Sequence, residues 1–129
     1  ENVKEGTEKV DLADACLKIA LSAQSCDYQI WGSEAQRTAY ASVVLERTAG
    51  QGELVDILFQ FTMDDGKVVM VRQTENVEFP ARLLKENERL LYEFNLTSVP
   101  ISIRAAAVVG SNELVCQLLG HASECLPVV

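Results

Sequence analysis

The four cysteines of this chain lie in two pairs at its ends, and this arrangement constrains the fold more than any other feature. Cys16 and Cys26 lie near the start, Cys116 and Cys125 lie near the finish, and the long stretch between them contains no cysteine. An even number of clustered cysteines is typical of disulfides formed in an oxidising compartment. The sequence therefore predicts disulfides among these residues in a secreted or lumenal protein, although a cytoplasmic protein is not excluded.

Three disulfide connectivities are possible, and the sequence leaves the choice between them open. Pairing one end with the other closes loops of about 90 to 110 residues and stabilises the fold by roughly 4.5–5 kcal/mol per bridge through loop-closure entropy. Local pairing closes loops of about 10 residues and stabilises less. If the bridges run from end to end, they bring the first and last elements of the chain together.

Two alternatives to disulfides were weighed. Cys16 lies on an apolar stripe, so reduced thiols in the core are the first alternative. The second is a metal site at Cys116, His121 and Cys125, whose spacing is C-x4-H-x3-C. Structural zinc sites use close C-x2–4-C pairs, which this chain lacks, and we therefore expect no metal ligands. His121, the only histidine, is expected to be an exposed loop residue.

Length and composition predict one domain covering residues 1–129, with residues 1–6 flexible. The net charge of −8 and the scattered Lys and Arg residues leave no basic stripe, so we expect no nucleic-acid partner. Anionic membranes would repel the chain. No apolar run approaches the ~20 residues of a spanning helix, and no membrane partner is expected.

The segment from Thr7 to about Gln24 predicts an amphipathic helix. Thr7 is a suitable N-cap, and the segment is rich in Ala, Leu and Lys, which favour helices. Its apolar residues recur at helical spacing. They are Leu12, Cys16, Ile19 and Ala23.

The rest of the chain alternates apolar and polar residues and predicts strands. We expect strands at 28–31, 38–48, 54–63, 68–71, 89–97 and 101–109, and a last strand or short helix at 113–119. Residues 80–93 fit either a helix or a strand, and a strand from about residue 89 is preferred. The predicted fold is α+β: one N-terminal amphipathic helix packed on a curved antiparallel sheet of five to seven strands.

A tight hairpin is predicted at residues 64–67, because an Asp-Gly pair there separates two strand patterns. In the expected register Met63 lies opposite Val68 and Phe61 lies opposite Met70. This register keeps one face of the hairpin mostly apolar.

The sequence offers no constellation of catalytic residues. Nucleotide-binding, hydrolase and zinc-protease motifs do not occur, and no cofactor is expected. Asp56 lies among apolar residues in the middle of a strand, and we expect it to face solvent. A small enzyme with a pocket between helix and sheet is therefore the weakest of the functional hypotheses.

The favoured hypothesis is a non-catalytic binding module for a protein, peptide or apolar ligand. Tyr28, Trp31 and Tyr40 lie at or near strand ends and are the candidate ligand contacts, although aromatic residues more often pack in cores. The alternative is a homo-oligomer or a subunit of a larger assembly, because the strand at 68–71 is apolar on both faces.

One modification site is predicted. Asn95, Leu96 and Thr97 form an N-glycosylation acceptor triplet. In a strand, Asn95 would point away from its apolar neighbours Phe94 and Leu96, and towards solvent.

Overall fold

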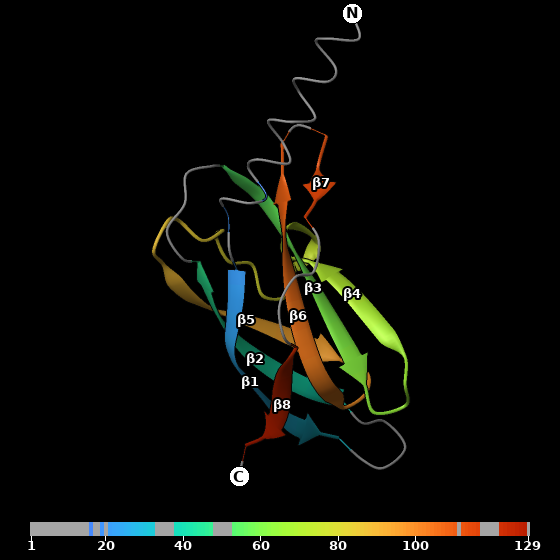
Figure 1. The fold of residues 1–129 in the computed structure, drawn as a ribbon. Helices are drawn as coiled ribbons and strands as arrows, with labels where there is room; N and C mark the ends of the chain where they lie inside the picture. Colours follow the sequence, from blue (N-terminus) through green and yellow to red (C-terminus); the bar gives the residue numbers. More distant parts are fainter. Residues whose placement is uncertain are drawn as a thin grey trace, which may run out of the picture.

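The computed structural model describes residues 16, 19, 21–32, 38–47, 53–110, 112–116 and 122–128. These residues form eight strands and one short 3-10 helix (Figure 1). The elements are β1 (Leu21–Trp31), β2 (Thr38–Arg47), β3 (Leu54–Met63), β4 (Val68–Arg72), η1 (Gln73–Glu75), β5 (Arg89–Leu96), β6 (Pro100–Val109), β7 (Leu114–Val115) and β8 (Ser123–Pro127).

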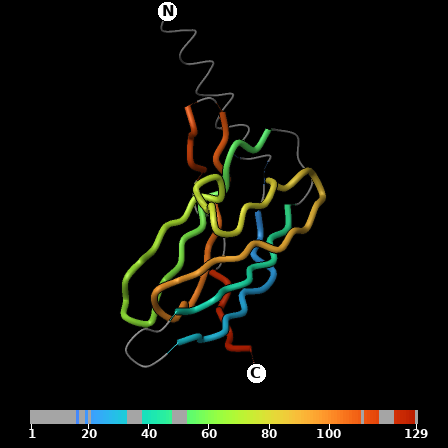
Figure 2. Tube along the Cα trace, turned by 180° about the vertical axis from the view of Figure 1, so that it is seen from behind, coloured from blue at the N-terminus to red at the C-terminus, as the bar shows by residue number. Residues whose placement is uncertain are grey.

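The strands form one sheet in the order β4-β3-β6-β8-β1-β2-β5, with β7 beside β6. The sheet curls so that its two halves face one another, as Figures 1 and 2 show. β8 joins the halves, because it pairs antiparallel with β6 and parallel with β1.

The core lies between β3 on one half of the sheet and β2 and β5 on the other. The inward side chains of β3 are fully buried: Ile57, Phe59, Phe61 and Met63. The ring of Phe59 lies 5.4 Å from that of Tyr92 and 4.7 Å from that of Phe94. The alternation expected of this strand is observed from Ile57 to Met63, whereas Val55, expected on the same face, is half-buried between the buried Leu54 and Asp56.

The prediction of an α+β fold is wrong. Residues 21–24, the last part of the predicted helix, belong to β1, where Leu21 and Ala23 are half-buried and alternate with exposed Ser22 and Gln24. This stretch fits the period of a strand as well as that of a helix, and its pairing with β2 outweighs the helical propensity of Ala and Leu. Residues 1–15 lie outside the described part of the chain.

The predicted hairpin forms, but its register differs by one residue. Phe61 lies opposite Val69 rather than Met70. The amide of Gly66 donates to the carbonyl of Met63, and Gly66 has a φ of 85°. This geometry gives a three-residue loop in place of the two-residue turn, and a one-residue change of register moves every side chain of β4 to the other face.

Asp56 is buried, so the prediction that it faces solvent is wrong. Its side chain is 1% exposed. One carboxylate oxygen accepts hydrogen bonds from the amides of Ile57 and Thr74, at 2.8 and 3.1 Å. The other accepts from the hydroxyl of Thr74 at 2.7 Å and lies 3.8 Å from the guanidinium of Arg72. Asp56 therefore anchors η1 to β3, and these contacts bury the side chain of Asp56.

The segment between η1 and β5 has no strand before Arg89, which confirms the preferred start of that strand. Polar contacts attach this segment to the sheet. The side-chain amide of Asn76 donates to the carbonyl of Glu93 at 2.8 Å, and the hydroxyl of Tyr92 donates to the carbonyl of Arg82 at 2.8 Å. The segment therefore runs beside the outer edge of β5 and partly occupies it.

The disulfides run from end to end, which settles the connectivity that the sequence left open. Cys16 pairs with Cys116 at a Cα–Cα distance of 5.5 Å, and Cys26 pairs with Cys125 at 4.5 Å. Cys26 and Cys125 lie directly opposite each other in the parallel pair β1–β8. This bridge therefore crosses the junction where the two halves of the sheet meet.

The disulfides remove the metal site weighed above, because Cys116 and Cys125 are both bonded to other cysteines. His121 lies outside the described residues. Two disulfides are compatible with an extracellular or lumenal protein. A search of the described residues for a helix long and apolar enough to cross a membrane found none.

Candidate functional site

An open apolar hollow lies at the end of the β1–β8 pair and is the candidate site. Its volume is about 460 Å³. It is lined by Tyr28, Gln29, Ile30, Trp31, Pro127 and Val128. Two of the three predicted contact residues, Tyr28 and Trp31, therefore lie in it together.

The parallel pairing of β1 and β8 builds this hollow. Tyr28 lies opposite Pro127, and the amide of Val128 donates to the carbonyl of Tyr28 at 2.8 Å. The Cys26–Cys125 disulfide lies two residues before this pair on each strand, so the two strands are covalently held at the base of the site. The backbone that carries the lining residues is thus fixed before any ligand arrives.

The surface around the hollow is apolar and exposed. Trp31 is 60% exposed and Ile30 is 49% exposed. Leu126 and Val128 on β8 and just beyond it are about half exposed as well. Trp31 is therefore a surface residue, whereas the half-buried Tyr28 packs against the core from the rim of the hollow.

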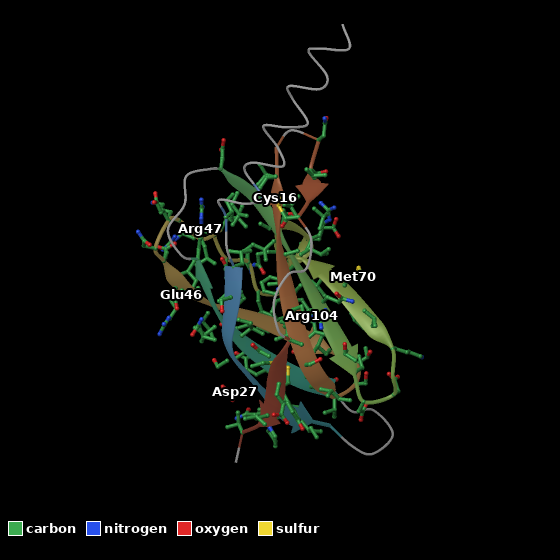
Figure 3. The ribbon with its side chains drawn as sticks, in the orientation of Figure 1. Cys16, Asp27, Glu46, Arg47, Met70 and Arg104 are labelled. Atoms are coloured by element: carbon green, nitrogen blue, oxygen red, sulfur yellow. A yellow bond between two sulfur atoms is a disulfide. The ribbon has the colours of Figure 1, made fainter. Side chains whose placement is uncertain are left out.

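The charges nearest to the hollow along its two strands are negative. None of its described lining residues is charged. Asp27 on β1 and Glu124 on β8 are exposed, and Figure 3 shows Asp27 at the β1–β8 pair. The chain as a whole carries a net charge of −8. A positively charged group would therefore be attracted to the rim of the hollow.

Tyr40, the third predicted contact residue, lies apart from the hollow on β2. It faces Gln29 of β1 on one side and Asn95 of β5 on the other. Its hydroxyl donates a short hydrogen bond to Glu93, which raises the pKa of that hydroxyl. Its ring packs edge-on against Phe79 with the centroids 5.7 Å apart. Tyr40 thus belongs to a second cluster on the outer face of the sheet.

Sequence reasoning did not assign Ile30, Pro127 and Val128 to the site. The signal that could have found them is the pairing of Cys26 with Cys125. A bridge between these residues in neighbouring parallel strands places the residues that follow Cys26 beside those that follow Cys125. Apolar residues alternate with polar ones after Cys26 and follow one another without interruption after Cys125.

A second hollow of about 400 Å³ lies near the loop that precedes β5. It is lined by Arg47, Glu53, Leu54, Leu83, Leu84, Lys85 and Glu86. The guanidinium of the buried Arg47 donates to the carbonyl of Leu84 at 3.1 Å and so holds this loop to β2. The packing of this loop against β2 therefore accounts for the charged residues that line the hollow.

Comparisons of the chain with family models, curated proteins and solved structures found no match. Within the described ranges, no group of three or more His, Cys, Asp and Glu side chains is arranged to hold a metal ion.

Proposed function

We propose that this chain is a non-catalytic, extracellular or lumenal binding module that accepts an apolar side chain of a protein partner in the β1–β8 hollow. One observation carries the proposal: the only tryptophan of the chain and three further half-exposed apolar side chains gather at one rigid strand end. Soluble proteins rarely leave such contiguous apolar surface without a role in binding. Tryptophan is also enriched among the residues that dominate binding energy.

The chemistry of the partner follows from the hollow and its rim. An apolar lining favours an aromatic or branched aliphatic side chain. The exposed carboxylates of Asp27 and Glu124 favour a Lys or Arg next to that side chain. We therefore expect a partner segment in which a large apolar residue is followed or preceded by a basic one.

A further feature supports binding. The disulfide at the base of the hollow lowers the entropy cost of binding, because the two strands need no ordering.

The first test of this function is a selection from a displayed peptide library. Peptides selected on the wild-type protein should carry the apolar and basic pair described above. Trp31→Ala should weaken their binding by about tenfold or more, the usual effect of removing a central tryptophan. The measurement is the dissociation constant by calorimetry, at low and high salt.

Met70→Ala is the matched control for Trp31→Ala, because Met70 is 59% exposed and lies on β4. This variant should bind the selected peptides as the wild type does. Equal binding by the wild type and the Trp31 variant, or a library that yields no binder, would reject the hollow as the contact surface.

Self-association through β4 is a second candidate function, and the corrected register of the hairpin favours it. β4 is an end strand of the sheet, and among the described residues only β3 pairs with it. Val68 and Met70 are more than one-third exposed on its outer face, whereas Val69 and Val71 pack towards the core. The second half of the sheet thus covers only one of the two apolar faces predicted for this strand.

Two copies can pair antiparallel along this edge about a two-fold axis at Val69. This register places Val68 of one copy opposite Met70 of the other. Apolar side chains then meet across the axis. The other end strand, β5, is less available, since Asn76 already donates to the carbonyl of Glu93.

Met70→Lys is expected to abolish this self-association, because an edge lysine opposes strand pairing. Sedimentation velocity across a range of concentrations measures the effect. Val77→Lys, at an 83% exposed position outside the strands, should leave association unchanged. A wild-type protein that stays monomeric at the highest concentration would exclude this second function.

A further inference from the structure

The acceptor triplet on β5 presents its two functional residues on one exposed face. Asn95 and Thr97 are exposed, whereas Leu96 between them is buried. The orientation predicted for Asn95 is therefore the one observed. No other Asn of the chain is followed by the x-Ser or x-Thr that glycosylation requires.

An aromatic surface lies directly beside Asn95. Tyr40 is its cross-strand partner on β2, at a position where opposing Cβ atoms are about 5 Å apart. The hydroxyl of Tyr40 is held by Glu93 and its ring by Phe79. The orientation of the ring is therefore fixed by contacts that do not involve Asn95.

Asn95 also has space and a polar partner. Its amide nitrogen donates to the carboxylate of the exposed Glu78 at 2.6 Å. It lines an open hollow of about 150 Å³, to which Asn76 and Val77 contribute as well. Because Asn95 is exposed, a group attached to this nitrogen reaches solvent, beside the edge at which Val71 and Phe94 also line the hollow.

We propose that Asn95 carries an N-linked glycan whose first sugar packs on the ring of Tyr40. In the transfer step, Nδ2 of Asn95 attacks the anomeric carbon of a lipid-pyrophosphate-linked oligosaccharide and forms the C–N bond. The bond from that carbon to the pyrophosphate oxygen breaks, the lipid pyrophosphate leaves, and Nδ2 loses one proton. The remaining N–H can still donate to Glu78. The C–H face of the sugar then covers part of the Tyr40 ring, because aromatic rings are stabilised when apolar groups cover their surface.

This proposal is independent of the binding function, because Asn95 and Tyr40 do not line the β1–β8 hollow. The two sites are nevertheless close, since Tyr40 lies opposite Gln29, a lining residue. A glycan at Asn95 would therefore border the hollow from the side of β5 and limit the approach of a partner from that direction.

The test is expression of the whole chain with a secretory leader in cultured insect cells, followed by intact mass measurement before and after peptide N-glycosidase. The wild type should carry mass that the enzyme removes. Asn95→Gln and Thr97→Ala should lose that mass, whereas Thr97→Ser should retain it. A wild-type chain secreted without removable mass would overturn the proposal.

A second measurement tests the contact with Tyr40. Enzymatic removal of the glycan should lower the midpoint of thermal unfolding of the wild type, and this shift should vanish in Tyr40→Ser. Phe79→Ala removes the ring that packs against Tyr40, and it should reduce the shift in the unfolding midpoint. If Tyr40→Ser does not fold, Phe79→Ala takes its place in the comparison. An unchanged shift in these variants would refute the packing of the sugar on Tyr40.

Discussion

Replacing all four cysteines with alanine is expected to lower the free energy of unfolding by about 8 kcal/mol, whereas removing either disulfide alone costs only about 3 kcal/mol. The loss from the four-cysteine variant should thus exceed the sum of the two single losses. Since a domain of this size is stable by about 5–15 kcal/mol, the variant without disulfides is expected to be largely unfolded.

The reason for this non-additivity is that the two bridges lie side by side in the chain. Their sequence separations are 100 and 99 residues. When one bridge is intact, the other closes a loop of only about 20 residues, made of the short segments between the cysteines at each end. After one bridge is removed, the remaining bridge still closes most of the chain into one loop. The large loop-closure entropy is therefore released only when the second bridge is removed as well.

Urea unfolding of the wild type, the two single-bridge variants and the four-cysteine variant measures these free energies. Costs that are simply additive would argue against the end-to-end connectivity. The connectivity is tested directly by a non-reducing digest after any free thiol has been alkylated. Trypsin cuts after Lys18 and so separates the first two cysteines, and a glutamate-specific protease cuts after Glu124 and separates the last two. Each pair of disulfide-linked fragments should contain one cysteine from each end of the chain, Cys16 with Cys116 or Cys26 with Cys125.

Phe59→Ala is expected to destabilise the protein by about 3–5 kcal/mol, the usual cost of removing a fully buried aromatic ring. Phe59 is completely buried on β3, and its ring meets those of Tyr92 and Phe94 from the opposite half of the sheet. Apart from the chain connections, the two disulfides join the halves only beside β1, β7 and β8. Contacts across the core therefore hold the rest of the curled sheet closed, and the cavity left by alanine lies between its halves.

Phe79→Ala is the control for Phe59→Ala. It removes the same ring from a partly exposed position, where one aromatic contact, with Tyr40, is observed. Its cost should be about 1 kcal/mol, close to that of one aromatic pair at the surface. Thermal and urea unfolding measure both variants. Similar losses at the two positions would contradict the packing of Phe59 between the halves of the sheet.

The strands of this fold could be predicted from the sequence wherever alternation was strong. β3 and β5 begin where they were expected, because their apolar residues recur at every second position. The helix expected up to residue 24 could not be excluded from the sequence, since Leu21 and Ala23 fit the period of a helix as well as that of a strand. What decides in favour of a strand is pairing with residues 45–47 of β2, which lie beyond the stretch that a local pattern covers.

The site was predictable only in part, for the same reason. Tyr28 and Trp31 were selected from their place at a strand end, but the hollow also needs Pro127 and Val128 from the other end of the chain. The pairing of β1 with β8 and the Cys26–Cys125 bridge bring these residues together. The burial of Asp56 likewise depends on η1 folding over β3, a contact that no local pattern of the sequence indicates.

Fluorescence of Trp31 is the most direct measurement of the proposed function, because the chain has no other tryptophan. In the free protein its emission should resemble that of an exposed indole and should be quenched efficiently by acrylamide. Addition of a peptide selected on the wild-type protein should shift the emission to shorter wavelength and protect it from acrylamide. A bound peptide that leaves both the emission and the quenching of Trp31 unchanged would contradict binding in the β1–β8 hollow.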